Sequence, residues 1–265
     1  MLDGLLLAVC VAMGAAGAWR VTTGRTRRTV AAACVAGMVA AGVGVWKLSS
    51  VRAAVLGPAV LSYPVDQPLV ALTFDDGPTP AYTKPVLDLL ETYDARATFF
   101  VTGHELTAHP ELGRQILAAG HELGNHSWSH PRLVFRSTED VREEIERTDD
   151  AIRAVGQAGT PAFRPPYFKR LLTVHQVLGD RPAVLASIDA DPRPDTAEAI
   201  AARVLARVRP GDIVLLHVSY ASRQSSRDAL PLILEGLAEQ GLQPVSLATL
   251  QRHARDYRVS RSSTR

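Results

Sequence analysis

From about residue 65 onward, short apolar segments alternate with segments of helical periodicity, and this alternation constrains the fold more than any other feature of the chain. The apolar segment "LVALTF" (69–74) ends at the turn sequence "DDGPTP", and residues 81–93 then carry apolar side chains at helical spacing. Strands separated by helices pair in parallel, which predicts an α/β domain. About seven such units favour a closed or nearly closed (β/α) barrel of about seven strands.

The same alternation continues to residue 250. Further strands are expected at residues 97–101, 121–127, 162–167, 183–189, 212–218 and 244–250. Further helices are expected at residues 110–120, 138–155, 196–208 and 229–241. The polar residues that fall at strand ends are Asp75, Asp76, Arg164, Tyr167, Asp189, Asp191 and His217. Because catalytic groups in (β/α) barrels lie at the C-terminal ends of the strands, we expect these side chains to gather on one face.

The beginning of the chain has a different character. Residues 5–19 and 29–46 are uncharged, apolar and rich in Ala and Gly, and each is near the lower limit of the about 17–25 residues that a spanning helix needs. Four arginines lie between them, in "RVTTGRTRRT", a charge bias that keeps a loop cytoplasmic. We therefore expect a transmembrane helical hairpin, with a single anchor or a cleaved signal sequence as alternatives. Each of these topologies places the following domain outside the cytoplasm.

Overall charge and cysteine content exclude few classes of protein, but they agree with a division into an apolar beginning and a larger domain. The 265 residues carry 29 basic and 27 acidic side chains, so the balance gives no indication of a nucleic-acid partner. Both cysteines, Cys10 and Cys34, lie in the apolar segments, which leaves the rest of the chain without a thiol. The larger domain is therefore stabilised without disulfides, and it is compatible with an oxidising compartment.

Two short sequences carry candidate chemistry. In "HSWSH", His126 and His130 can converge on one metal if the segment forms a helical turn, although surface or core histidines are the alternative. In "FDDG", the adjacent carboxylates of Asp75 and Asp76 repel each other and are costly near a core unless a cation or hydrogen bonds compensate them. One Asp can bind a metal while the other acts as a base towards water. These residues together predict hydrolysis of an amide or an ester.

Five stretches, "LTFDDGP", "ATFFVTG", "GHELGNHSWSH", "FRPPY" and "IVLLH", resemble the polysaccharide deacetylases that share the NodB-homology domain, also called carbohydrate esterase family four. They occur in the family's order and cover about residues 69–250. The resemblance implies a distorted (β/α) barrel. It also implies that Asp75 is the general base, and that Asp76, His126 and His130 are ligands of a divalent metal. Zinc suits this ligand set best, and cobalt, nickel or iron fit the same ligands.

The resemblance also gives roles to residues around the metal. Arg164 resembles the arginine that keeps the base charged, and Tyr167 the residue whose backbone N–H stabilises the oxyanion together with the metal. His217 resembles the general acid that protonates the leaving amine. Leu215 resembles a wall of the acetyl-methyl pocket, and Pro166 is expected beside the substrate.

The chain departs from the family pattern at "DADPRP". The family has Asp, two residues and then Asp-Trp, whereas this motif is one residue short and Pro192 replaces the tryptophan. We assign Asp191 to tuning the histidine acid, with Asp189 as its substitute. The sequence after Tyr167 also lacks the family's glycine. Both departures affect the substrate groove, so the sequence leaves the substrate preference open.

These inferences predict a membrane anchor at residues 1–52, a linker at 53–64, a catalytic domain at 65–251 and a basic tail at 252–265. The expected activity is metal-dependent removal of acetyl groups from a cell-envelope polysaccharide, peptidoglycan above all. The acetylated glycan and the membrane are the expected partners, and the catalytic domain is expected at the cell membrane, facing outside the cytoplasm. Two alternatives remain: a domain that binds metal and glycan without turnover, and a deacetylase of a small amide or a secondary polymer.

Overall fold

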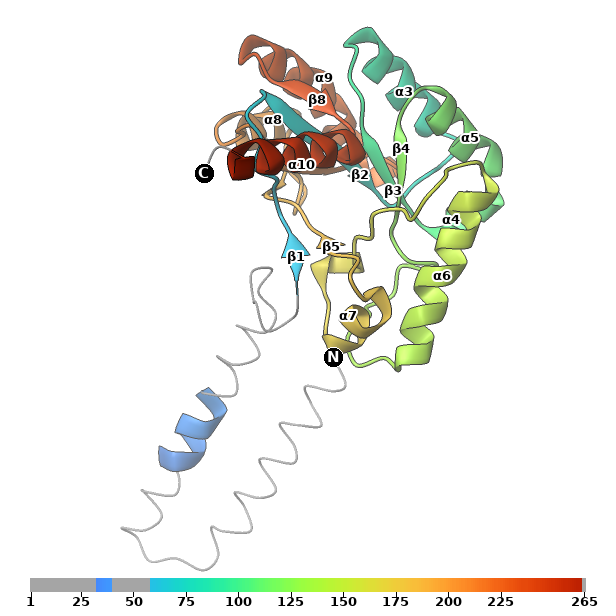
Figure 1. Ribbon diagram of the computed structural model, residues 1–265, viewed down its shortest axis with the longest axis vertical. Coiled ribbons are helices and arrows are strands. Elements are labelled where there is room, and N and C mark those ends of the chain that lie inside the picture. Colours follow the sequence, from blue (N-terminus) through green and yellow to red (C-terminus); the bar gives the residue numbers. More distant parts are fainter. Residues whose placement is uncertain (1–31, 40–57, 264–265) are drawn as a thin grey trace, which may run out of the picture. The chain divides into compact units, whose positions relative to one another are not determined.

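The computed structural model describes residues 32–39 and 58–263 (Figure 1). The chain divides into two units, Met1–Val55 and Leu56–Arg265. Most of the expected transmembrane hairpin lies outside the described residues; of its second segment, residues 32–39 are helical. Within the described ranges, no helix has the length and apolar character required to cross a membrane.

A parallel sheet forms the centre of the larger unit. Strand β2 (Leu69–Asp75) is buried along its whole length and pairs in parallel with three others, β3 (Thr98–Val101), β7 (Ile213–His217) and β8 (Gln243–Val245). Two further strands extend this sheet in parallel: β4 (Glu122–Asn125) beyond β3, and β6 (Ile188–Asp189) beyond β7. The predicted α/β architecture with a parallel sheet is confirmed.

One short stretch of chain links the two ends of this sheet. Strand β5 (Ala183–Val184) pairs in parallel with β1 (Ala59–Val60), and Phe163 bridges in parallel to Asn125 of β4 and to Ala183 of β5. Strand β6 follows β5 directly in the same segment and pairs with β7. The pairings therefore continue from β6 through the central strands to β4 and return through Phe163 to β5.

The two faces of β2 have different surroundings. Leu72 and Phe74 belong to the core between the sheet and the outer helices, whereas Ala71 belongs to a second cluster on the opposite face. Side chains alternate between faces along a strand, so Thr73 and Asp75 lie on the same face as Ala71. This alternation directs Asp75 to the inner side of the curved sheet, at the C-terminal end of its central strand.

Helices surround the sheet (Figure 1). They are α3 (Thr83–Thr92), α4 (Gly103–Ala108), α5 (Pro110–Ala118), α6 (Thr138–Ala154), α7 (Leu172–Leu178), α8 (Ala197–Leu205), α9 (Gln224–Glu239) and α10 (Leu247–Ser263). Side chains cap the starts of α6 and α8: Ser137 accepts from the N–H of Asp140, and Thr196 accepts from the N–H of Ala199. Helices α4 and α7 were not among the expected elements.

Three expected strands differ from the structure. Residues 183–189 form two short strands, β5 and β6, instead of one. Residues 162–167 form only a bridge at Phe163, followed by the 3₁₀ turn η2 (Pro166–Phe168), because consecutive prolines have no N–H groups for a strand ladder. The last expected strand ends at Val245, and α10 begins two residues later, where the hydroxyl of Ser246 accepts from the N–H of Thr249. The expected basic tail is therefore helical as far as the structure describes it.

Candidate metal centre and catalytic site

The predicted site residues gather at one pocket, as the positions of the strand ends require. A cavity of about 320 Å³ opens at the C-terminal ends of β2, β6 and β7. Its lining includes Asp75, Asp76, His126, His130, Tyr167, Asp191, Leu215 and His217. Two predicted residues lie outside the lining: Arg164 is fully buried behind Asp75, and Pro166 is buried in η2.

Both carboxylates of "FDDG" reach this pocket because of an unusual backbone conformation. Adjacent side chains of a strand normally point to opposite faces of the sheet. Asp75 is the last residue of β2, and Asp76 follows it with φ of 76°, in the left-handed region that non-glycine residues rarely adopt. This turn brings the second carboxylate to the same side as the first.

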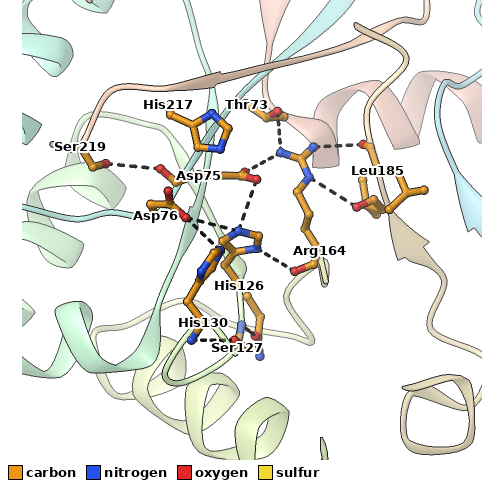
Figure 2. A network of polar contacts seen from close by, with 12 residues as sticks. Thr73, Asp75, Asp76, His126, Ser127, His130, Arg164, Leu185, His217 and Ser219 are labelled. Carbon is orange, nitrogen blue, oxygen red and sulfur yellow. Dashed lines mark hydrogen bonds and ion pairs between the residues drawn. The ribbon is translucent and has the colours of Figure 1, made fainter. Parts of the chain in front are cut away.

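Asp76, His126 and His130 bring three ligand atoms together (Figure 2). The Oδ1 atom of Asp76 lies 3.3 Å from Nε2 of His130 and 3.5 Å from Nε2 of His126. This oxygen is buried, and among the described residues it has no hydrogen-bond partner. Ligands held at about 2.0–2.2 Å from a tetrahedral ion lie about 3.4 Å apart, so the observed spacing fits a divalent metal.

The two histidines converge from a loop, so the helical turn considered for their convergence is not needed. Ser127 and His130 have positive φ angles, 67° and 55°, which no helix contains. Side chains hold the loop instead, since Asn125 Oδ1 accepts from the N–H of Ser127 and Ser127 Oγ accepts from the N–H of His130. The rings of His126 and His130 consequently lie 4.8 Å apart, centroid to centroid.

Both imidazoles are prepared for ligation. Nδ1 of His126 lies 2.8 Å from the carbonyl oxygen of Arg164, and a proton on Nδ1 that is donated to this carbonyl leaves the lone pair of Nε2 facing Asp76. Burial, together with the neighbouring His126, lowers the pKa of His130. A lowered pKa favours the neutral imidazole, which is the form that binds metals.

Asp75 is held by a buried arginine (Figure 2). Nη1 of Arg164 donates to Asp75 Oδ1 at 2.6 Å and to the hydroxyl of Thr73 at 2.9 Å, while Nη2 donates to the carbonyl of Leu185 at 3.1 Å. The guanidinium also lies 4.0 Å from the ring centroid of Phe100. With one carboxylate oxygen fixed in this way and the Asp75 side chain lining the pocket, Asp75 is placed to receive a proton there.

His217 and Asp191 form the second charged pair of the pocket. Nδ1 of His217 lies 2.8 Å from Asp191 Oδ1, and the backbone N–H of His217 donates to Oδ2 at 2.9 Å. Burial acts to lower the pKa of His217, but the hydrogen bond to Asp191 and the charges of Asp75, Asp191 and Asp76 outweigh it, and the pKa is raised. Burial acts to raise the pKa of Asp191, and its bonds to His217 and Ser226 outweigh that effect. His217 thus favours its protonated form.

Asp189, the alternative to Asp191, has different surroundings. It lines the same pocket, but its Oδ1 is buried and has no hydrogen-bond partner among the described residues. Burial, with the nearby charges of Asp191 and Asp75, raises its pKa. Although the motif is one residue short, the structure places Asp191, and not Asp189, against His217.

Tyr167 and Leu215 form parts of the pocket wall. Tyr167 is 53% exposed, and its ring lies 4.7 Å from the ring of His130, centroid to centroid. Leu215 is buried on β7, where it pairs in register with Asp189. Phe168 stands where the family has glycine and has φ of 56°, the left-handed conformation that glycine adopts without strain.

Other residues at the site were not among the predictions. Thr73, which binds Arg164, was detectable in principle because it precedes Asp75 by two residues on the same face of β2. Ser226 donates to Asp191 Oδ2 at 2.5 Å from the first turns of α9, and no sequence signal links these residues. Arg223 also lines the pocket, from the 3₁₀ turn η3 (Ala221–Arg223), and no motif singled it out.

Comparison with known proteins shows to which family the chain belongs. The sequence model of a family described as polysaccharide deacetylase matches residues 62–182. The peptidoglycan-N-acetylmuramic acid deacetylase PdaC of Bacillus subtilis is 35% identical over 190 residues, which are 70% of this chain and 39% of that protein. The chain therefore spans well under half of this relative.

Two other proteins match over most of their length. A peptidoglycan-N-acetylglucosamine deacetylase of Bacillus cereus is 37% identical over 197 residues, covering 72% of this chain and 91% of the relative. The crystal structure of the Bc1960 peptidoglycan N-acetylglucosamine deacetylase superposes with a TM-score of 0.68 at 30% identity, covering 72% of this chain and 92% of that one. The chain belongs to the polysaccharide deacetylase family of hydrolases.

Proposed function

We propose that this chain is a metal-dependent deacetylase that removes N-acetyl groups from the sugars of peptidoglycan. One observation carries the proposal: a three-residue ligand cluster, a carboxylate paired with a buried arginine, and a histidine paired with a carboxylate all face one cavity. Relatives that act on peptidoglycan, by their names, support the choice of substrate. The activity is hydrolysis of a carbon–nitrogen bond other than a peptide bond.

The ligand cluster and the two residue pairs have separate roles in this reaction. When bound by Asp76, His126 and His130, a divalent metal polarises the acetyl carbonyl and lowers the pKa of water. Asp75, held by Arg164, takes a proton from the attacking water.

The remaining steps use the other side of the pocket. The backbone N–H of Tyr167 donates to the oxyanion that forms on the carbonyl oxygen. His217 then gives its Nε2 proton to the departing amine, while Asp191 holds the proton on Nδ1. Leu215 is the apolar wall beside the acetyl methyl, and Pro166 supports the Tyr167 turn from below the surface. Acetate and a free amino sugar are the products.

The identity of the metal, the finer architecture and the location belong to the same proposal. One carboxylate and two imidazoles suit zinc best, and cobalt, nickel or iron fit the same ligands. The circuit of strand pairings supports a distorted (β/α) barrel. The uncharged apolar segments at 5–19 and 29–46 support attachment to the cell membrane, with the catalytic domain outside the cytoplasm.

A substrate panel tests the proposed function. Full-length, zinc-loaded protein is incubated with peptidoglycan glycan strands, chitin oligomers and small N-acetylated amides, and released acetate is measured. We expect release from peptidoglycan strands at a higher kcat/KM than from the other substrates. Release from small amides alone identifies a different deacetylase, and zinc and glycan binding without any release identifies a binding domain.

A further inference from the structure

Among the described residues that line the pocket, Arg223 is a cation that the proposed reaction does not use. Arg223 lines the cavity beside Asp191 and Pro192, and its side chain is 31% exposed. Its Nη1 donates to the backbone carbonyl of Asp191 at a long 3.3 Å and lies 4.0 Å from the Oδ2 atom of that residue. Across the part of the chain that the structure describes, the guanidinium makes no other hydrogen bond or ion pair. A guanidinium has five N–H donors, so most of its hydrogen-bonding capacity is unused.

Three of the four carboxylates that line the pocket already have other roles or partners. Asp75 is paired with Arg164, Asp191 with His217 and Ser226, and Asp76 belongs to the ligand cluster. Asp189 is not within ion-pair distance of Arg223, and burial raises its pKa. The free donors of Arg223 are therefore available to a group that enters the cavity from solution.

The wall next to Arg223 also differs from the usual groove of the family. Pro192 stands where the family pattern has a tryptophan, and it is exposed at the pocket. The wall therefore lacks an indole on which the face of a sugar could stack, and it offers a partly exposed guanidinium instead. Arginine binds planar carboxylates through two parallel hydrogen bonds, which makes it a selective partner for this group.

We propose, on the basis of the proposed function, that Arg223 binds a carboxylate carried by the acetylated sugar. Muramic acid carries such a group on its lactyl ether, whereas glucosamine has none. The two relatives differ in this respect, since one is named for N-acetylmuramic acid and the other for N-acetylglucosamine. Arg223 thus sets the preference of this pocket for an anionic acetamido sugar. At about 320 Å³, the cavity is near the lower end of ligand pockets, which suits recognition of one sugar unit at a time.

A matched pair of substrates tests this role. Peptide-free glycan oligomers with a free lactyl carboxylate are compared with the same oligomers in which the carboxylate is converted to a carboxamide. We expect the full-length, zinc-loaded protein to show a kcat/KM about 10- to 100-fold higher for the carboxylate, mainly through a lower KM, as a charge-assisted hydrogen bond provides. Arg223→Gln should have equal kcat/KM values for the two substrates. Arg223→Lys should retain part of the preference, because lysine keeps the positive charge but lacks the two parallel N–H donors of arginine.

Arg193→Gln is the matched control, because it removes the same charge from an exposed residue nearby that does not line the cavity. This variant keeps the preference for the carboxylate. If Arg223 acted only by tuning Asp191 and His217, Arg223→Gln would slow both substrates equally and shift the pH profile, and that result overturns the proposal. Equal kcat/KM values for both substrates in the unsubstituted protein overturn it as well.

A binding measurement separates this inference from the proposed function. Dissociation constants of the two oligomers are determined for the zinc-loaded protein and for Arg223→Gln. A carboxylate preference in binding that is lost in Arg223→Gln, without acetate release from either oligomer, supports the role of Arg223 and contradicts the deacetylase. Acetate release from both oligomers with equal dissociation constants supports the deacetylase and contradicts the role of Arg223.

Discussion

Arg164 and Asp75 form a buried ion pair in which Nη1 lies 2.6 Å from Oδ1 and the two side chains are 0% and 3% exposed. The arginine comes from the segment after Phe163, and the aspartate ends the central strand on the inner face of the sheet. Arg164 also binds Thr73 and Leu185, so its position is fixed by several elements. The pair therefore joins the segment after Phe163 to the central strand β2, and it holds one carboxylate oxygen of Asp75, the candidate base.

This pair predicts a large effect on stability when only one partner is removed. Arg164→Gln leaves the Asp75 carboxylate buried without its counter-charge, and we expect the free energy of unfolding to fall by about 3–5 kcal/mol. Urea unfolding of the full-length protein without added metal measures this change. The double variant Arg164→Gln, Asp75→Asn should lose less than the sum of the single variants. Additive losses would show that the two side chains do not interact.

The pair of His217 and Asp191 predicts a change in pH dependence. If His217 acts as an acid, activity is lost as pH rises through its pKa, which the hydrogen bond and charge of Asp191 help to raise. Asp191→Asn removes that charge, so the pKa of His217 falls and the basic limb of the kcat/KM profile moves to lower pH. Asp189→Asn is the control and should move this limb less. An unchanged limb in Asp191→Asn would contradict the proposed acid.

The ligand cluster predicts which residues retain zinc. His126→Ala or His130→Ala should lower the zinc content after dialysis from about one ion per chain to almost none, because two ligands are too few for a tight site. His104→Ala is a matched control, since this histidine is exposed on α4 outside the cluster. Metal analysis of the purified proteins gives the answer. Full zinc retention in both cluster variants would exclude this site.

His121 predicts a dependence of stability on acid that is independent of catalysis. Its Nδ1 accepts from the N–H of Ala97, and burial lowers its pKa from 6.5 to about 4. The unfolded chain therefore binds a proton at a higher pH than the folded chain. The contribution of His121 to the free energy of unfolding is intact above pH 6.5, and protonation of the unfolded chain lowers that free energy by ~3 kcal/mol as pH decreases towards 4. In His121→Asn, urea unfolding between pH 7 and pH 4 should show this loss reduced, and a loss as large as in the unsubstituted protein would be evidence against this origin.

The sequence predicted much of the sheet because strands and turns are local features. Buried strands such as β2 and β7 have uninterrupted β-forming sequences, and the polar residues after them were expected on one face. The first turn of α10 was missed because "PVSLATL" is equally compatible with a strand, and the choice depends on the cap at Ser246.

Side-chain hydrogen bonds explain what the sequence could not predict at the site. The pair spacing suggested that His126 and His130 converge if the segment is a helical turn, but a loop held by Asn125 brings them together instead. Likewise, the hydrogen bond from Ser226 to Asp191 joins residues 35 positions apart, which no local pattern encodes. The membrane segments remain a prediction, since they lie largely outside the described residues.

Acetate release by full-length protein and by Asp75→Asn, each with zinc bound and after removal of zinc, tests whether the metal and Asp75 together carry out the deacetylation. We predict that only the zinc-loaded, unsubstituted protein releases acetate rapidly from N-acetylated peptidoglycan strands. Asp75→Asn should bind the same amount of zinc and release acetate about 10²–10⁴ times more slowly, because it lacks the base. Acetate release by zinc-loaded Asp75→Asn at the unsubstituted rate, or by zinc-free protein, would contradict metal-dependent deacetylation with Asp75 as the base.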